Sequence, residues 1–268
     1  MQISNLTKKY DKKIVLNDIN ITFNKSCSLL LGENGSGKTT FFLIVAGIIK
    51  KYSGEIDVKD NVSLLLDEPN LFKYKTGIEN LDYFLLKEEK AVALEYVSYF
   101  SMDNYINSRV STYSNGMKKK LSLVIALSRN KEILLLDEPT NSLDFSSISL
   151  LKELLIKLKE NKIVLISSHD IAIYDDRLID EVYLLKKGKI NLIESNLFNY
   201  YYYKVKTVNP IEKMSFEFQL LEDNYIFKVP KKEFNEFSKE LGQYLIKEMV
   251  LVDYFDPIYL GDLYEENA

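Results

Sequence analysis

The segment from residue 32 to residue 39 constrains the fold of this chain more than any other. Its sequence, Gly-Glu-Asn-Gly-Ser-Gly-Lys-Thr, matches the phosphate-loop pattern G-x-x-x-x-G-K-[ST] in full. A short apolar strand pattern, Ser28 to Leu31, precedes it, and a helical pattern, Thr39 to Ile49, follows it. A glycine turn that merely caps a helix is the alternative, but such a turn requires neither the lysine nor the threonine. The segment therefore predicts a phosphate-binding loop between a strand and a helix.

Each residue type in this loop has a chemical task. The glycines allow successive backbone N–H groups to converge on phosphate oxygens. Lys38 is expected to reach the β and γ phosphates of a nucleotide, and Thr39 to offer its hydroxyl to Mg²⁺. The residues that we expect to bind the nucleotide here are Gly32, Glu33, Asn34, Gly35, Ser36, Gly37, Lys38, Thr39 and Thr40.

Short apolar strand patterns alternate with helical patterns along most of the chain. Ile133 to Asp137 is followed by a helical pattern from Ser146 to Lys159, and Ile163 to Ser167 by another from Ile171 to Arg177. This alternation predicts parallel strands joined by crossover helices. The first thirty residues instead have the spacing of antiparallel, half-buried strands, and residues 70 to 130 are mainly helical in pattern. We expect a mixed α/β core with a helical insertion.

The character of the chain changes after a run of four tyrosines, residues 200 to 203. Alternating apolar residues, a turn at residues 222 to 224 and a helical spacing from Phe234 to Leu241 predict a small α+β extension. Residues 206 to 268 contain seven Lys and thirteen Asp plus Glu, which gives −6 and leaves +2 for residues 1 to 205 because the whole chain has −4. We therefore expect a first domain at 1–205 and an acidic extension at 206–268.

Composition excludes several classes of protein. A net charge of −4 provides no global positive field for nucleic-acid binding. The single cysteine, Cys27, excludes an intramolecular disulfide, and together with the single histidine, His169, it cannot form a four-ligand zinc site; we therefore expect a reducing compartment. The longest apolar run, Phe41 to Ile49, has nine residues, fewer than the ~20 of a membrane-spanning helix. The N-terminal residues lack the pattern of a signal peptide, so we expect a cytosolic protein.

Two nearly identical heptapeptides are candidates for the carboxylates that a phosphate loop requires. Leu-Leu-Leu-Asp-Glu-Pro occurs with Asp67 and Glu68 and again with Asp137 and Glu138. Either copy could present the aspartate to the metal ion and the glutamate to an attacking water. The second copy ends a stronger buried strand and leads into Asn-Ser-Leu-Asp, so the pattern favours Asp137 and Glu138.

The order of motifs is similar to that of the ATP-binding cassette (ABC) of transporter ATPases. After the phosphate loop come Tyr-Ser-Asn-Gly-Met at residues 113 to 117, the second Asp-Glu-Pro, Ser-Leu-Asp ending at Asp144, and then His169. These correspond to the Walker A, signature, Walker B, D-loop and switch-histidine motifs, over about residues 1 to 205. The resemblance implies a P-loop NTPase cassette with antiparallel β and helical subdomains.

The resemblance also implies the roles of individual residues. Asp137 would hold Mg²⁺ through water, Glu138 would be the catalytic base beside the catalytic Lys38, and His169 would contact the γ-phosphate of ATP. Ser114 and Gly116 are the residues that the signature retains, although Tyr113, Asn115 and Met117 depart from the usual Leu-Ser-Gly-Gly-Gln. Asp144 would contact the opposite subunit and cap the following helix, and Tyr10 would stack on adenine. Asp67 replaces the usual glutamine of the Q-loop and could still reach Mg²⁺ through a water.

The function that this resemblance implies is that of the ATP-hydrolysing subunit of an ABC exporter. Two cassettes, as a homodimer or with a paralogue, would enclose ATP and drive a separate integral-membrane permease docked beside Phe72, Tyr74 and Tyr83. The protein would then lie at the inner face of the cell membrane and bind no nucleic acid. The alternatives are a soluble ABC ATPase acting on ribosomes or DNA, and a degenerate cassette that binds ATP without hydrolysing it.

Overall fold

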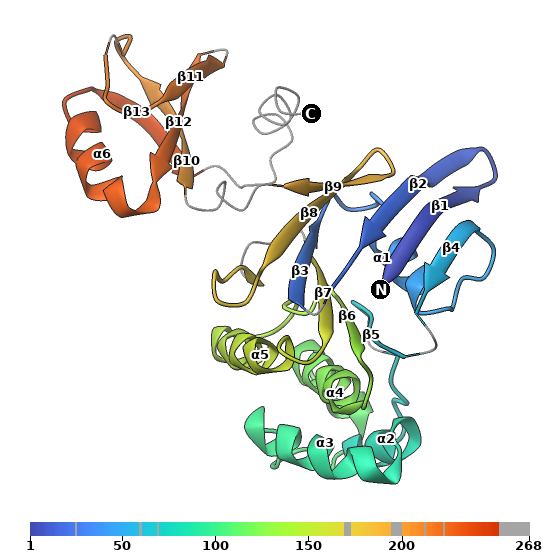
Figure 1. Ribbon diagram of the computed structural model, residues 1–268. Coiled ribbons are helices and arrows are strands. Elements are labelled where there is room, and N and C mark those ends of the chain that lie inside the picture. Colours follow the sequence, from blue (N-terminus) through green and yellow to red (C-terminus); the bar gives the residue numbers. More distant parts are fainter. Residues whose placement is uncertain are drawn as a thin grey trace. The chain divides into compact units, whose positions relative to one another are not determined.

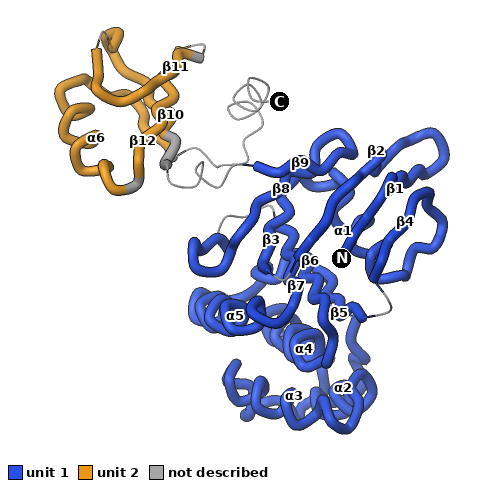
Figure 2. Tube along the Cα trace, viewed as in Figure 1, with its two compact units in different colours: residues 1–193 blue, residues 194–268 orange. Residues whose placement is uncertain are grey.

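The computed structural model describes residues 1–24, 26–58, 61–68, 70–168, 173–193, 200–211, 213–221 and 223–251. The chain divides into two compact units, residues 1–193 and residues 194–268 (Figure 2). None of the helices in these ranges is both long enough and apolar enough to cross a membrane.

A six-stranded sheet forms the centre of the first unit. Its strand order is β5 (Val62–Leu65), β6 (Ile133–Asp137), β7 (Ile163–Ser168), β3 (Ser26–Leu31), β8 (Glu181–Lys186) and β9 (Lys189–Ile193). Neighbouring strands are parallel from β5 to β8, and only β9 is antiparallel to its neighbour. The inner strands are almost continuously apolar and buried, as expected for parallel strands covered on both faces. The predicted α/β core is confirmed.

A second, three-stranded antiparallel sheet contains the N-terminal strands. Its order is β2 (Lys13–Thr22), β1 (Gln2–Tyr10) and β4 (Ser53–Asp57). The helix α1 (Lys38–Val45) contributes Phe41 and Phe42 to one buried cluster that also contains Leu16 of β2 and Leu135 of β6. This shared core joins the two sheets around the helix that follows the phosphate loop (Figure 1).

The segment from residue 77 to residue 128 is mainly helical, as predicted. It comprises α2 (Gly77–Phe84), α3 (Lys87–Tyr99), the 3₁₀ turn η1 (Val110–Thr112) and α4 (Asn115–Ser128). Helix α5 (Phe145–Leu158) then separates β6 from β7. Thr76 and Glu79 form a reciprocal capping pair at the start of α2.

The helix expected between Ile171 and Arg177 is wrong for the residues that are described there. Ile173 lies in a 3₁₀ turn, and residues 174 to 177 form no α-helix. The reason is local, because the Asp175 carboxylate accepts a hydrogen bond from the backbone N–H of Arg177, and the Asp175 carbonyl accepts one from Leu178. Such Asp-centred turns compete with helix formation.

The second unit contains an antiparallel sheet with a helix. The sheet order is β11 (Phe218–Leu221), β12 (Asn224–Pro230), β10 (Tyr200–Thr207) and β13 (Ile246–Leu251), and η4 (Lys231–Glu233) leads into α6 (Phe234–Leu241). The α+β character, the hairpin and the helix of the extension were predicted from the pattern. The expected boundary between residues 205 and 206 falls inside β10, because Tyr203 and Val205 pack into the core of this unit with Phe227 and Phe237.

Candidate functional site

The phosphate loop ends at the N-terminus of α1, where its geometry leaves backbone donors unused. Gly37 has φ of 113°, and a Cβ atom there would lie 2.8 Å from Val15 Cγ1, so both backbone conformation and space require glycine. The N–H group of Phe41 donates to the carbonyl of Gly37 at 2.9 Å, one turn into the helix. The N–H groups before Phe41 therefore have no partner within the helix, and they are available to an anion.

A pocket of about 270 Å³ opens in front of this helix. The loop and the first helical residues contribute seven of the expected nucleotide-binding residues, and the ends of β5 and β6 contribute three carboxylates. Its lining consists of Val15, Glu33, Asn34, Gly35, Gly37, Lys38, Thr39, Thr40, Asp67, Asp137 and Glu138. Gly32 and Ser36 are not part of this lining, although Ser36 has a buried hydroxyl that makes no hydrogen bond to the described residues. The unused donors and the size of the pocket fit a polyphosphate.

Lys38 and Thr39 touch the second Asp-Glu-Pro. Thr39 Oγ1 donates a hydrogen bond of 2.7 Å to Asp137 Oδ2. Lys38 Nζ donates to the carbonyl of Gly32 at 2.6 Å and lies 3.6 Å from Glu138 Oε1. The loop cation, the threonine hydroxyl and the two carboxylates that the pattern favoured therefore meet in one buried place, although Lys38 and Asp137 are 99 positions apart in the sequence.

Two serines that sequence analysis did not select also hold these carboxylates. The hydroxyl of Ser167 donates to Asp137 Oδ1, and the hydroxyl of Ser168 donates to Glu138 Oε2 at 3.2 Å. Asp137 pairs with Ser167 in the parallel register of β6 and β7, which brings the two strand ends together. The only signal in the sequence is their position at the end of a strand, directly before His169.

The backbone at Glu138 is itself unusual. Its φ of 46° lies in the left-handed region, which a glutamate adopts only at some cost in energy. The N–H of Glu138 donates to the Ser167 carbonyl at 3.1 Å, and this contact helps to hold the conformation. Strained residues of this kind cluster at functional sites.

The donor set suits Mg²⁺ in chemical type. The hydroxyl of Thr39 and the carboxylate of Asp137 are adjacent oxygen donors, which Mg²⁺ prefers. Within the described ranges, no group of three or more His, Cys, Asp or Glu side chains is arranged to hold a metal ion. A site with one carboxylate fits an ion that keeps its water ligands and binds phosphate oxygens.

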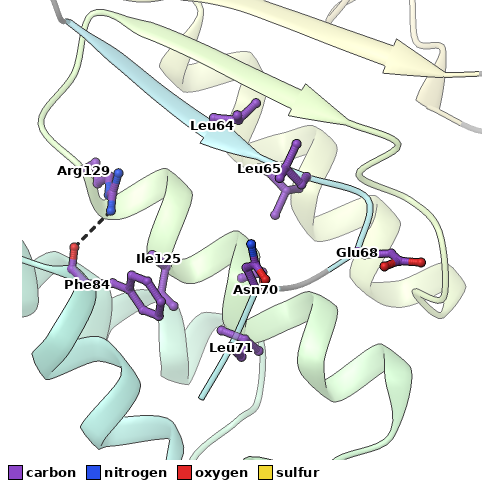
Figure 3. A pocket seen from close by; sticks show the side chains of 10 residues that line it. Leu64, Leu65, Glu68, Asn70, Leu71, Phe84, Ile125 and Arg129 are labelled. Carbon is purple, nitrogen blue, oxygen red and sulfur yellow. Dashed lines mark hydrogen bonds between the residues drawn. The ribbon is translucent and has the colours of Figure 1, made fainter. Parts of the chain in front are cut away.

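The two carboxylates of the first Asp-Glu-Pro lie in two different pockets. Asp67 lies at the edge of the phosphate pocket, where Asn141 Nδ2 donates to its Oδ1 at 3.0 Å and Lys119 Nζ lies 3.4 Å from the same oxygen. Glu68 instead lines a second pocket of about 130 Å³ with Leu65, Leu71 and other apolar residues (Figure 3). Only the second Asp-Glu-Pro therefore has both of its carboxylates beside the phosphate loop.

The signature residues and Asp144 lie at helix N-termini outside the pocket lining. Ser114 caps α4 by accepting a hydrogen bond of 3.2 Å from the N–H of Met117. A Cβ atom on Gly116 would lie 2.7 Å from the carbonyl oxygen of Ser142. Asp144 caps α5, and hydrogen bonds from the Ser146 hydroxyl and from Ser147 hold the pKa of its carboxyl well below the usual range. The expected helix-capping role of Asp144 is present.

The remaining candidates are Tyr10 and His169. Tyr10 is partly exposed at the end of β1 and is absent from the pocket lining, with Lys8 Nζ 4.3 Å from the centre of its ring. The β1–β2 hairpin that carries Tyr10 also carries Val15, which does line the pocket. His169 lies outside the described residues.

Comparison with known proteins agrees with this geometry. A family model described as "ABC transporter" matches residues 16–141. An uncharacterized ABC transporter ATP-binding protein of Methanocaldococcus jannaschii is 34% identical over 197 residues, which cover 70% of this chain and 75% of that protein. The lantibiotic transport ATP-binding protein SrtF of Streptococcus pyogenes is 31% identical over 205 residues, covering 72% and 89% respectively.

A solved structure has the same fold as the first part of this chain. It is a dimeric ATP-binding cassette in a post-hydrolysis state, bound to ADP and Pi. The match has a TM-score of 0.64 at 23% sequence identity and covers 72% of this chain and 99% of that chain. The mixed sheet, the antiparallel sheet and the helical segment are therefore those of an ABC cassette fold.

Proposed function

The chain belongs to the ABC transporter ATP-binding cassette family, a family of ATPases, and on that premise we propose that it is the ATP-hydrolysing subunit of an exporter with a separate permease. The observation that carries the proposal is the meeting of Lys38 and Thr39 with Asp137 and Glu138 at the phosphate loop. A degenerate cassette would be expected to lack one of these groups.

Within the pocket, each side chain has a distinct task. The N-terminus of α1 and Lys38 bind the phosphates of ATP, while Thr39 and Asp137 hold Mg²⁺. Mg²⁺ supplies charge neutralisation of the phosphate oxygens when it is bound. Glu138, held by Ser168, accepts a proton from the attacking water. Burial of Lys38 and Glu138 excludes bulk solvent from the place where the proton moves.

A second cassette would complete the site. Ser114 is exposed at the N-terminus of α4 and does not line its own phosphate pocket. Phe145, directly after Asp144, is also almost fully exposed and could be covered by a second cassette. These residues support a dimer in which Ser114 and Gly116 of one cassette face the γ-phosphate bound to the other, and Asp144 lies at the contact.

The second pocket supports docking of the permease on the helical segment. Phe84 lines this pocket (Figure 3). It stacks on Phe72, and the ring centre of Phe72 lies 4.4 Å from that of Tyr83. Tyr83 and Tyr74 are 64% and 88% exposed, and the buried Ser122 hydroxyl in the pocket makes no hydrogen bond within the described part of the chain. An apolar pocket with an unused hydroxyl suits an amphipathic segment of another protein.

The test is purification of the native complex from membranes through a tag on this chain. We expect an integral-membrane protein with several spanning segments to co-purify, and Tyr74→Ser with Tyr83→Ser to reduce its yield. Leu192→Ser is the matched control, since Leu192 is an exposed apolar residue of β9, away from the helical segment.

Recovery of ribosomal RNA or DNA in place of a membrane protein would contradict the proposal and favour a soluble ABC ATPase. The relative SrtF is named as a lantibiotic transport protein, which supports a role in transport, and export is our proposal for the direction. Location at the inner face of the membrane would follow from binding to the permease.

A further inference from the structure

Lys119 is a buried lysine in the second turn of α4, the helix that starts at the signature. Only 2% of the residue is exposed, so its ammonium group has little access to water. Burying a charged ammonium is costly unless oxygen acceptors replace the lost water. An apolar residue of the same length would fill the space without that cost, so the charge calls for an explanation.

The ammonium of Lys119 lies between the two Asp-Glu-Pro segments. Its Nζ donates to the backbone carbonyl of Asp67 at 3.2 Å and to the carbonyl of Asp137 at 3.4 Å, and it lies 3.4 Å from Asp67 Oδ1. One side chain therefore joins α4 to the ends of β5 and β6. Asn141 holds the same carboxylate oxygen from the turn after β6.

The charges around the phosphate pocket explain why a cation is needed there. The lining contains four carboxylates, those of Glu33, Asp67, Asp137 and Glu138, and one cation, Lys38. ATP adds further negative charge, so an uncompensated carboxylate at the mouth of the pocket would repel it. Lys119 is behind Asp67 and offsets that carboxylate without occupying the pocket.

We propose that Lys119 is a positioning residue for ATP binding, which holds the Asp67 carboxylate at the pocket mouth and offsets its charge. The same contact ties the phosphate site to the helix that carries Ser114. Asp67 and Lys119 would therefore act as a pair that replaces the uncharged glutamine usual at position 67. This inference rests on the proposed ATP site.

The experiment is a double-mutant cycle on the full chain, with the dissociation constant of ATP measured by calorimetry in the presence of Mg²⁺. The variants are Lys119→Met, Asp67→Asn and the two together. Lys118→Met is the matched control because it removes the same charge from the neighbouring position of α4, where the structure gives no contact of the side chain with Asp67 or Asp137.

We expect Lys119→Met to weaken ATP binding about tenfold when residue 67 is Asp, and by about twofold or less when it is Asn. Lys118→Met should leave affinity unchanged within about twofold. A lysine that only supported the fold would cause the same loss whichever residue stood at position 67. Equal losses in the two backgrounds, or no loss in either, would therefore overturn the proposal.

Circular dichroism establishes beforehand that each variant is folded. If Lys119→Met is not folded, Lys119→Arg and Lys119→Gln replace it, since the first keeps the charge and the second keeps only a donor. Affinity retained by Arg and lost by Gln supports the proposal, and the reverse order overturns it. Failure of the unchanged chain to bind ATP at all would instead contradict the proposed function.

Discussion

At the scale of single residues, the two copies of the Asp-Glu-Pro heptapeptide are distinguished by the residues that surround each of them. Asp137 and Glu138 are buried and receive hydrogen bonds from Thr39, Ser167 and Ser168. Asp67 is about half exposed at the pocket edge, and Glu68 lies in a different pocket. The two Asp-Glu-Pro copies therefore have different environments. The copy at the end of β6 adjoins the phosphate loop and β7, whereas the copy after β5 adjoins α4.

Glu138→Gln should retain ATP binding while hydrolysis falls by roughly 10²–10⁴, the usual contribution of a positioned general base. The amide keeps the size of the side chain but cannot accept the proton of the attacking water. Steady-state phosphate release and equilibrium ATP binding are the two measurements.

Glu68→Gln is the internal control for this experiment, because it makes the same chemical change in the other copy of the heptapeptide. Its turnover should stay close to that of the unchanged chain. If Glu68→Gln were the slower enzyme, the assignment of the base to residue 138 would be wrong.

The residues of the site that belong to a sequence motif could be predicted, and those that reach it only through folding could not. The phosphate loop and the carboxylates at residues 137 and 138 follow a linear pattern, so spacing alone pointed to them. Ser167, Ser168 and Lys119 do not, because their partners lie 18 to 52 positions away and the contacts arise only from the packing of α4, β6 and β7. Apart from the position of the two serines at the end of a strand, nothing in the sequence distinguishes these residues from other serines and lysines.

At the scale of elements, hydrophobic patterns predicted the strands well but did not predict where two of the helices end or fail to form. The strands β3, β6 and β7 are mostly apolar, and their positions followed directly from this pattern. The helix expected to reach Ile49 ends at Val45, where Gly47 adopts φ of 71°. The helix expected near Ile173 is replaced by a turn around Asp175, because the hydrogen bonds that Asp175 accepts from Arg177 and Leu178 are not visible in hydrophobic periodicity.

The N-terminus of α4 offers a prediction at this scale. In the Glu138→Gln background with ATP bound, the chain should sediment as a dimer, and Ser114→Arg should return it to a monomer. Arginine would place bulk and charge where the helix meets the second cassette. Analytical ultracentrifugation with and without ATP is the measurement.

Ser114→Ala distinguishes the role of Ser114 in the dimer contact from its role as the N-terminal cap of α4. It removes the hydrogen bond to the N–H of Met117, at a cost of about 1 kcal/mol of stability, but adds no bulk. It should therefore remain largely dimeric. If the Glu138→Gln chain with Ser114 unchanged stays monomeric in the presence of ATP, the homodimer is contradicted. A heterodimer with a paralogue would then be the next hypothesis.

At the scale of the whole molecule, the chain divides after residue 193, whereas the change of sequence pattern after the tyrosine run predicted a boundary at residue 205. The negative charge accumulates beyond residue 205, but the tyrosine run already belongs to the second unit through β10, which pairs with both β12 and β13. Charge counts report where acidic residues gather, whereas a unit boundary depends on which strands pair. Pairing between residues that are far apart in the chain could not be deduced from composition.

A chain ending at Ile193 should accordingly retain ATP binding, with an affinity within about threefold of the full chain. All of the pocket-lining residues lie in the first unit. The measurement is calorimetry after folding has been established by thermal unfolding. A folded 1–193 chain unable to bind ATP would mean that the second unit contributes to the site.

A chain ending at Lys204 is the informative comparison. It would keep half of β10 without β12 and β13, and so leave an unpaired apolar strand that promotes association between molecules. We expect it to be less soluble than the shorter chain, which light scattering would detect.

The close approach of Gly116 to the carbonyl of Ser142 has a consequence for movement. A Cβ atom at position 116 would lie 2.7 Å from that carbonyl oxygen, so the N-terminus of α4 and the turn that follows Glu138 have no free space between them, and neither can move toward the other without displacing it. In the proposed dimer, α4 would face the nucleotide of the second cassette while Glu138 faces its own. This contact would then be a direct mechanical link from one nucleotide to the other.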